Sequence, residues 1–506
     1  MVLVYDRQQA SFHGFRVNAP TPVKQESASG LSSAWRLSVV VVAVFLALFT
    51  VQGDDGLRHI GLAFGTPRPW GAVYPFSYFQ VYSGYDLWRG YDLSLRALAR
   101  VLGLLPVPLA VQRMMALKLV SGALAGMLLW LCVRRARIAE ALRTPASLLL
   151  GLAMTAAWLA EPVLRQLMAR PFAFGTLLLV FAVGQRGAVR GFLACALTIF
   201  LYPHLAWLYT GAVGVAHLVR GDRRFAAGSL LATALSFVLQ PPAFWGMFGA
   251  LLHADRVRAQ LPNIGELTSL WDNGAQLVMS LGVLIVLLPQ VREPRRLGVE
   301  QVLMLAFVPA AIKYVRYFVD VELTLAFVAY GADALRALER AAARLLGDWR
   351  RLLGSHEVPA SPAPGRSRLL RPLLVLGYAA VAVLLALDCV RQYHQLGRAG
   401  ALLAGVPAGT LILTGFNDQY DILYNRPDLS VVPSCEIGLV RDDIESAYVD
   451  FFKRGRVCHL AKTISASYLL DSRGNYLDPT DTACLHLVRD DGLLRLWEIA
   501  RKDRPR

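Results

Sequence analysis

The chain has 506 residues, of which 55% are hydrophobic and only 17% are charged, and its formal net charge is +16 at pH 7. Soluble domains of ordinary composition carry about 25% charged residues, so this composition excludes a typical soluble protein. The positive charge comes from 46 Arg and 6 Lys. Much of it lies in short loops beside apolar runs, where membrane topology and anionic lipid headgroups account for it. The sequence predicts a polytopic membrane protein that contacts membrane lipids and binds no nucleic acid.

The N-terminal region precedes a first membrane helix. Residues 1–36 are polar and are too long for the basic n-region of a signal peptide. The apolar run 37–51 follows, without a small-residue cleavage site after it. We therefore predict a cytoplasmic N-terminal tail over 1–36 and a retained first helix.

Ten further apolar runs match the roughly 20 residues that a helix needs to cross a bilayer, although several are short. The predicted spans are 114–133, 146–160, 171–185, 191–203, 205–219, 225–240, 275–291, 298–312, 319–335 and 372–389. The stretch FLYPHLAWLY (200–209) is predicted to separate two helices, because the alternation of basic loops requires two crossings between Arg190 and Arg220.

Arginine placement predicts the orientation. With the N-terminus inside, the arginine-rich loops all fall on the cytoplasmic side. The result is an N-in/C-out membrane domain of about eleven helices over 37–391, with a Pro/Ser/Gly-rich cytoplasmic linker at 352–368. The bias to Arg over Lys and to Ala and Leu indicates a GC-rich bacterial genome, so the expected location is the bacterial inner (cytoplasmic) membrane.

The polar C-terminal region, 392–506, is predicted to be a small α/β domain on the periplasmic side. Strands are expected at 410–416 and 429–434, an amphipathic helix at 442–455, and a hairpin at 484–499 around Asp491-Gly492. An extracytoplasmic location permits a disulfide. Both Cys435–Cys458 and Cys458–Cys484 are compatible with the sequence.

The first outside loop, 52–113, is the longest between spans and begins with ionisable groups. Asp54 and Asp55 follow the first helix directly, and Arg58 and His59 come next. An aromatic-rich stretch (70–92) and an alternating apolar and basic stretch (93–113), which suits a helix in the membrane interface, complete the loop. The aromatic side chains that we expect to line a substrate cavity are Tyr74, Tyr85 and Trp88.

Other predicted outside segments carry further ionisable groups on the same face of the membrane. The basic residues are Arg165 and Arg170 in 160–172, and Lys313 and Arg316 in 312–322; the histidines are His204 and His253. Ionisable groups near membrane depth indicate a functional site when they face an internal cavity. Arginine binds phosphate because its planar fork donates two hydrogen bonds and stays charged. The set predicts a cavity at the bilayer surface for a lipid-linked anionic substrate.

These features resemble the GT-C superfamily of membrane glycosyltransferases, with its bacterial arabinosyl- and mannosyltransferase-like members. The resemblance is carried by the acidic pair after the first span, the long aromatic loop, ARPFAFG (169–175), LYPHLAWLY (201–209) and a polar domain after the last span. It covers nearly the whole chain, through loose motifs. It implies transfer of a sugar from a polyprenyl-phosphate donor to a glycan, lipid or protein acceptor on the extracytoplasmic side.

By this resemblance, Asp54 or Asp55 is the general base that takes the proton of the acceptor hydroxyl. Asp54 matches the leading acid of a DE pair, whereas Asp55 and Arg58 form a DxxR spacing. The donor-phosphate site is assigned to Arg165, Arg170, Lys313, Arg316 and Arg58, and the substrate-lining set also includes His59, His204 and His253. The chain contains no DxD triplet, so no metal ligand is assigned; Mg²⁺ or Mn²⁺ is an option that the resemblance leaves open.

Three alternative functions remain from the sequence. A transporter or flippase of lipid-linked sugars would also use polar loops, although such proteins carry ionisable residues at mid-span and often internal repeats. An O-antigen ligase or polymerase would have its large outside loop late in the chain. A receptor-like or assembly protein would use the C-terminal domain to bind a partner.

Overall fold

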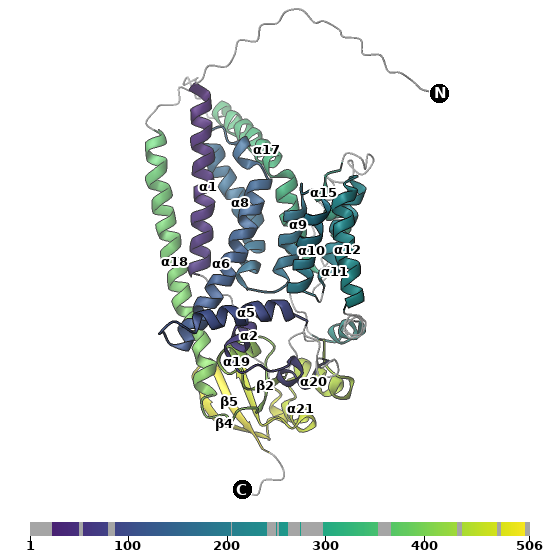
Figure 1. Cartoon of the computed structure of the whole chain (residues 1–506). Coiled ribbons are helices and arrows are strands. Elements are labelled where there is room, and N and C mark those ends of the chain that lie inside the picture. Colours follow the sequence, from purple (N-terminus) through teal and green to yellow (C-terminus); the bar gives the residue numbers. More distant parts are fainter. Residues whose placement is uncertain are drawn as a thin grey trace, which may run out of the picture.

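The computed structural model describes residues 23–49, 54–78, 87–203, 205–239, 252–261, 297–352, 366–432, 438–472 and 477–500, together with the single positions Gly249 and Gly274. The chain forms a mostly helical body, from which a small domain with one sheet extends at the C-terminal end (Figure 1).

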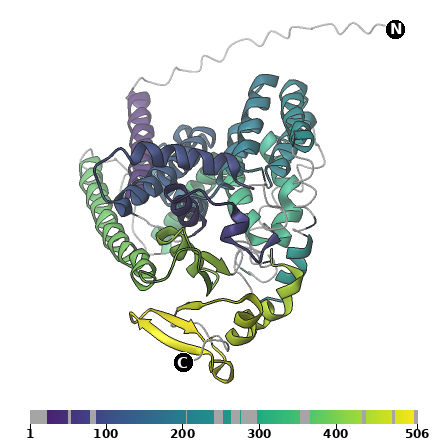
Figure 2. The ribbon, with the colours of Figure 1, turned by 60° about the horizontal axis from the view of Figure 1, so that its bottom comes forward.

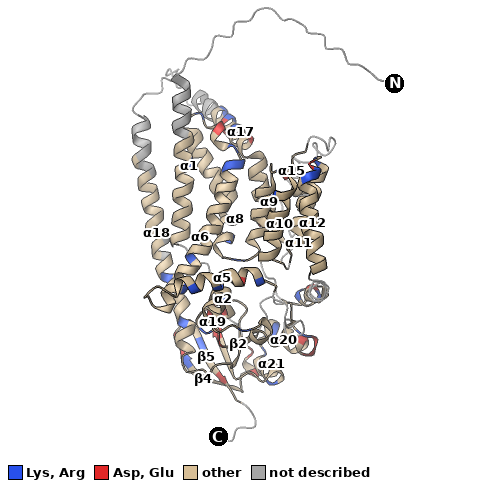
Figure 3. Cartoon of the chain, viewed as in Figure 1, with Lys and Arg blue, Asp and Glu red and all other residues tan. Residues whose placement is uncertain are grey.

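Among the residues that the structure describes, four helices of the body are long and apolar enough to cross a membrane. They are α1 (Val23–Phe49), α6 (Leu109–Arg135), α8 (Pro145–Leu167) and α18 (Arg366–Leu402), and they run side by side in Figure 1. Charged residues are sparse along these helices and are found near their ends and in the C-terminal domain (Figure 3).

Further helices of the body form a second group beside the first (Figure 1). They are α9 (Ala173–Ala182), α10 (Ala188–Leu201), α11 (Ala206–Val219), α12 (Arg223–Leu239), α15 (Val299–Lys313) and α17 (Leu323–Leu352). The chain leaves the helix at Tyr202 and re-enters it at Ala206, which confirms the predicted break in this stretch. The predicted span 275–291 and most of the linker 352–368 lie outside the described residues.

Two segments predicted as outside loops are helical. The sequence ended the third span at residue 160, but α8 continues to Leu167 because Leu159, Val163 and Leu167 keep burying one face at helical spacing. The segment 312–322 is likewise not a loop. It contains the end of α15, the short helix α16 (Val315–Tyr317) and one π-helical turn, η4 (Phe318–Glu322), which runs directly into α17.

The stretch 93–113 is also divided differently from the prediction. Helix α5 (Arg89–Leu102) covers only its first half, and α6 already begins at Leu109, after Pro108. Proline lacks the N–H that a continuing helix would need but is well tolerated just before a helix begins. Figure 1 shows α5 lying across the ends of the long helices, between the helical body and the C-terminal domain.

The C-terminal domain contains a five-stranded sheet with the order β2-β1-β3-β5-β4. The first three strands are parallel, and β5 and β4 are antiparallel. The strands are β1 (Leu411–Thr414), β2 (Ser430–Val432), β3 (Tyr468–Ser472), β4 (Leu485–Asp490) and β5 (Leu494–Ile499). The predicted strands and hairpin are therefore confirmed, and Gly492 adopts the positive φ of 91° that the hairpin turn requires.

Three helices accompany the sheet in this domain: α19 (Asp418–Asn425), α20 (Glu445–Arg454) and α21 (Val457–Ile464). The predicted helix 442–455 is present as the 3-10 turn η5 (Asp442–Ile444) followed by α20, which ends at Gly455. A disulfide joins Cys458 to Cys484, one of the two pairings that the sequence allowed. Cys435 lies outside the described residues.

The domain is fixed to the body through its first helix. The Asn425 amide at the end of α19 donates to the Leu396 carbonyl of α18 at 2.6 Å. Arg426 donates to the carbonyl oxygens of Leu403 and Val406, just after α18. The view from below shows α19 lying between the sheet and the helical body (Figure 2). This attachment places one side of the domain against the loop that carries the acidic pair.

Candidate functional site

The acidic pair forms the start of helix α2 (Asp55–Phe64). Asp54 is its N-cap residue, and its Oδ1 accepts a hydrogen bond from the Asp55 backbone N–H at 2.5 Å. Its Oδ2 is paired with the Arg170 guanidinium from the segment between α8 and α9. A carboxylate at this position satisfies an N–H group that the helix leaves free and favours the helix dipole. Both oxygens of Asp54 are therefore engaged.

Asp55 lies within a group of cationic side chains. Its Oδ1 is 3.1 Å from the Arg58 guanidinium, and within the described part of the chain no hydrogen bond reaches its Oδ2. Burial alone would raise the pKa of Asp55, but the charges of Arg58, Arg170, His59 and Arg316 together lower that pKa below its ordinary value. The Asp55 carboxylate is thus ionised at neutral pH and remains available on one side.

Aromatic rings enclose the Arg58 guanidinium. Its central carbon lies 5.4 Å from the Trp70 ring, 5.1 Å from the Trp88 ring and 5.7 Å from the Tyr420 ring. Such distances allow cation–π attraction. Trp70 and Trp88 come from the segment 52–113, whereas Tyr420 comes from α19 of the C-terminal domain. The domain thus contributes a wall of the site.

The contacts of His59 are structural and join two helices. Its Nδ1 lies 2.6 Å from Asp92 Oδ1, and the Trp70 indole N–H donates to Asp92 Oδ2 at 3.1 Å. The imidazole is fully buried, and the rings of Trp70, Trp88 and Tyr91 meet it edge-on. These contacts hold α2 against α5, so His59 orients the helix that begins with the acidic pair.

A second cationic group adjoins the first. Arg165 lies 3.2 Å from Asp320, and Arg316 lies 3.7 Å from the same carboxylate, on the π-helical turn. The Phe172 ring lies 4.0 Å from Arg316 and 5.4 Å from Arg170, so it connects the two groups. Of the predicted phosphate-site arginines, Arg58 therefore pairs with Asp55 and Arg170 pairs with Asp54. Arg316 contacts the Phe172 ring, which Arg170 also approaches.

Other predicted site residues lie elsewhere. The Lys313 ammonium pairs with Asp255 at 2.6 Å and is 60% exposed. His253 belongs to a separate cluster between the segment 252–258 and the C-terminal domain. Tyr74, in contrast, stacks on Trp70 beside the site and donates from its hydroxyl to Gln419 of α19 at 2.8 Å. Tyr85 and His204 lie outside the described residues.

Several residues of the site were not predicted from the sequence. Asp92 lies in the aromatic stretch 70–92 and Asp320 among the ionisable groups of 312–322, but neither was assigned to the site, whereas Tyr420 and Gln419 lie in a domain of which no site residue was expected. The signal for Asp92 was its place in the aromatic stretch WRGYD. The sequence contains no comparable signal for Tyr420, because only the folded chain brings α19 to α2.

Two glycines allow α2 to fit between its neighbours. A Cβ at Gly56 would lie 2.4 Å from the Met168 carbonyl oxygen, and the Gly56 N–H donates to that oxygen at 3.2 Å. A Cβ at Gly61 would lie 2.1 Å from the Leu423 carbonyl oxygen of α19. Only glycine allows both approaches. The acidic pair is therefore positioned by backbone contacts on two sides.

An apolar groove of about 400 Å³ lies between α1, α6, α8 and α18. It follows α8 from Leu152 to Val163, and Val163 stands half a turn before Arg165. Its lining also includes Val39, Leu46, Leu129 and Tyr378. The groove thus offers an apolar wall along α8, whereas Arg165, two residues beyond Val163, faces the other side of that helix.

Together these contacts describe a site with one available carboxylate, several arginines and an aromatic wall. A buried carboxylate can take a proton from a hydroxyl group, and neighbouring guanidinium groups can bind an anion that forms nearby. The site lies where α2, the α8–α9 segment and α19 meet. It can therefore hold an acceptor hydroxyl and an anionic leaving group in the same place.

No family model and no curated protein matches the sequence. Among solved structures, the chain is similar to the crystal structure of ArnT from Cupriavidus metallidurans bound to undecaprenyl phosphate. The similarity has a TM-score of 0.45 and a sequence identity of 15%, and it covers 94% of this chain and 99% of that chain.

Proposed function

We propose that the chain is a membrane glycosyltransferase of the GT-C type. It transfers a sugar from a polyprenyl-phosphate donor to an acceptor hydroxyl of a glycan, lipid or protein, on the extracytoplasmic side of a bacterial inner membrane. The observation that carries the proposal is the placement of the Asp55 carboxylate beside Arg58, Arg170 and Arg316, at the junction of the helical body and the C-terminal domain.

In this proposal Asp55 is the general base. Its Oδ2 is available, whereas both oxygens of Asp54 are engaged by the helix N-terminus and by Arg170. The acceptor oxygen attacks the anomeric carbon, its proton passes to Asp55, and the bond from the sugar to the phosphate breaks. A carboxylate that stays ionised in a buried site suits this role.

The arginines bind the phosphate. The lipid phosphate departs as an anion, so it needs positive charge and no protonation by a helper acid. Arg58, Arg170 and Arg316 surround the carboxylate, and Arg165 follows through Asp320. The polyprenyl chain occupies the apolar groove along α8.

Transfer by single-substitution variants tests the assignment. Membranes with Asp55→Asn are expected to lose about 10²–10⁴-fold of the rate with a polyprenyl-phosphate sugar donor, as removal of a general base does. Asp54→Asn is expected to keep more activity, because asparagine also caps helices. Asp333→Asn, an exposed acid on α17 paired with Arg336, is the matched control.

Full transfer by the Asp55→Asn variant would overturn the assignment of the base. Movement of the labelled lipid across vesicles without any glycosylated product, in the unsubstituted protein, would favour the transporter or flippase instead. Equal loss of transfer in the Asp54→Asn and Asp55→Asn variants would be consistent with a glycosyltransferase. It would not identify which of the two aspartates is the general base.

A further inference from the structure

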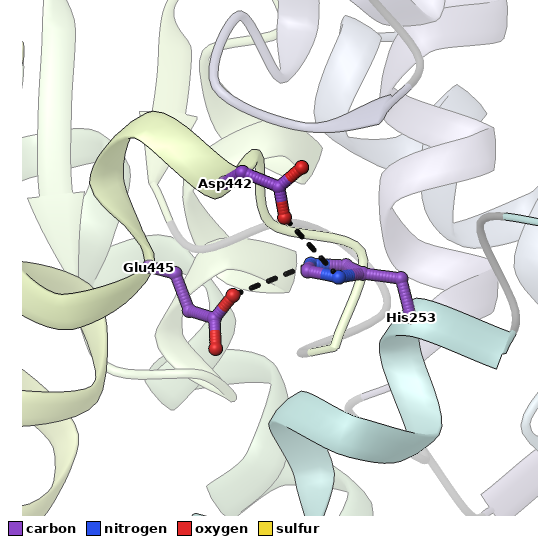
Figure 4. A group of neighbouring side chains, drawn as sticks. All are labelled: His253, Asp442 and Glu445. Atoms are coloured by element: carbon purple, nitrogen blue, oxygen red, sulfur yellow. Dashed lines mark ion pairs between the residues drawn. The ribbon is translucent and has the colours of Figure 1, made fainter.

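A separate cluster of three potential metal ligands lies at the contact between the helical segment 252–258 and the C-terminal domain. His253 comes from that segment, Asp442 from η5 and Glu445 from the start of α20 (Figure 4). One ligand atom of each residue lies within 4.8 Å of the others. His253 Nδ1 is 3.3 Å from Asp442 Oδ1, and Nε2 is 3.9 Å from Glu445 Oε2.

The hydrogen bonds of His253 fix the orientation of its ring. Nε2 lies 3.0 Å from the Val440 carbonyl oxygen, which can only accept, so this nitrogen carries the proton. Nδ1 therefore presents its lone pair to the carboxylate side of the cluster. A histidine that donates its other N–H to a backbone carbonyl is the usual arrangement at metal sites. The imidazole is 10% exposed and packs edge-on against Tyr78.

A cation already occupies the point where the three ligands converge. Arg256 Nη2 lies 2.9 Å from His253 Nδ1, 3.3 Å from Asp442 Oδ1 and 2.8 Å from Glu445 Oε2. The Arg256 side chain is 61% exposed, so it can rotate into solvent. One guanidinium charge faces two carboxylates, which leaves one negative charge uncompensated.

The carboxylates of Asp442 and Glu445 also accept hydrogen bonds from neighbouring side chains. The Tyr78 hydroxyl donates to Asp442 Oδ2 at 3.2 Å, and the Gln260 amide donates to Glu445 Oε1 at 3.1 Å. Each bond uses the oxygen that does not face Arg256. Such outer contacts orient the other oxygen toward the centre of the cluster.

We propose that His253, Asp442 and Glu445 form a binding site for a divalent transition metal ion, Zn²⁺ in particular, which takes the place of the Arg256 guanidinium. One imidazole nitrogen and two carboxylate oxygens suit Zn²⁺, with water as the fourth ligand. Mg²⁺ and Ca²⁺ prefer oxygen ligands alone. The three ligands need to move inward from the guanidinium distances to about 2.0–2.2 Å from the metal.

The metal would join the segment 252–258 to the C-terminal domain. Two residues after His253, Asp255 pairs with Lys313 and accepts from the Tyr314 hydroxyl at 2.6 Å, so the same segment is tied to the end of α15. A bound ion would stabilise the attachment of the domain that supplies Tyr420. This site is distinct from the acidic pair of α2, and the inference does not depend on the proposed reaction.

Zinc titration of the purified full chain in detergent, after chelator treatment, tests the site. The readouts are the zinc bound per chain and the thermal midpoint. We expect one saturable zinc that raises the midpoint, and at least about tenfold weaker binding in His253→Gln and in Glu445→Gln. Asp443→Asn is the matched control, because this neighbouring acid pairs with Arg441 outside the cluster.

The Arg256→Gln variant gives the decisive comparison. If the guanidinium competes with the metal, its removal tightens zinc binding several-fold, and zinc restores any stability that the lost ion pairs cost. If the cluster is an ion-pair contact only, the same variant lowers the midpoint and zinc restores nothing. That result would overturn the proposal, as would zinc binding that is equal in the unsubstituted chain and the His253→Gln variant.

Discussion

Two adjacent aspartates have different environments at the start of α2. Asp54 caps the helix and is neutralised by Arg170, whereas Asp55 faces Arg58 with one oxygen and leaves the other available. A side chain that both caps a helix and pairs with an arginine is held in one geometry. The neighbouring position is therefore the one that can change partners during a reaction.

Arg58→Gln is expected to change the pH dependence of transfer. Burial raises the pKa of Asp55, and Arg58 is the largest influence that opposes it. Without Arg58 the pKa of Asp55 rises, so the base becomes protonated at a higher pH as the medium is acidified. The acidic limb of the kcat/KM profile should therefore move to higher pH.

The profile of Arg336→Gln provides the comparison, since Arg336 pairs with Asp333 on an exposed part of α17. An acidic limb that stays at the same pH in Arg58→Gln, whatever the rate, would show that the ionisation of Asp55 does not limit transfer.

The sequence predicted that the acidic pair and the nearby arginines belong to the site, because they are charged groups beside apolar runs. It did not predict Tyr420 or Asp320 as partners, because their proximity depends on packing between distant segments. It also grouped Lys313 with the phosphate site, whereas that ammonium pairs with Asp255. Charge and spacing indicate candidate residues, but they contain no information on which candidates face one another.

Among the elements, α2 is the one most constrained by its surroundings. It lies between the Met168 carbonyl on one side and α19 on the other, and both approaches require glycine. This short helix is too small to be stable by itself. Its conformation is therefore maintained by the elements that enclose it.

Gly61→Ala is expected to destabilise the contact between α2 and α19. The new Cβ would lie 2.1 Å from the Leu423 carbonyl oxygen and 2.7 Å from the Tyr424 Cα, which are backbone atoms that cannot rotate away. The expected cost is about 1–3 kcal/mol, as for other overpacked sites. A lower thermal midpoint and faster proteolysis of the C-terminal domain would be measured.

Gly397→Ala in α18 is the matched control, since nothing lies within 4 Å of its Cβ position. There alanine should be neutral or stabilise the helix by about 0.5–1 kcal/mol. If both variants were equally stable, α19 would not rest on α2 in the membrane-embedded protein.

The boundaries of elements were predicted less well than their existence. The sequence ended the third span at residue 160, before Glu161 and Arg165, yet α8 continues because its apolar residues keep burying one face and because Asp320 pairs with Arg165. The prediction of 93–113 as one interfacial helix missed the separation at Pro108. In contrast, the hairpin around Gly492 was predicted correctly, because its turn is specified by adjacent residues.

In the whole molecule, the C-terminal domain is part of the candidate site. Tyr420 and Gln419 reach the wall of the site, and Asn425 and Arg426 attach the domain to α18. A domain connected in this way is not an appendage that only recruits an acceptor. Its integrity should therefore determine the activity of the whole chain.

Removal of the Cys458–Cys484 disulfide by alanine at both positions is expected to destabilise the domain by about 3–4 kcal/mol, because the bond closes a loop across a separation of 26 residues. Thermal unfolding followed by proteolysis measures the loss. A reductant should lower the midpoint of the unsubstituted chain and leave that of the variant unchanged.

The same bond tests the orientation in the membrane. Disulfides persist on the oxidising side, so a protease added to intact spheroplasts should reach the domain. Protection from that protease, or a midpoint that a reductant does not change, would contradict a domain on the extracytoplasmic side.

Helix α18 runs without interruption from Arg366 to Leu402, and the C-terminal domain is fastened near its end. An α-helix turns by about 100° for each residue. One residue inserted into α18 would therefore rotate the fastened domain by about a quarter of a circle and carry Tyr420 away from Arg58. Seven inserted residues would restore the angle to within about 20° but lift the domain by about 10 Å. The length of α18 thus sets the rotation of the C-terminal domain about the helix axis, and with it the face of the domain that meets the acidic pair.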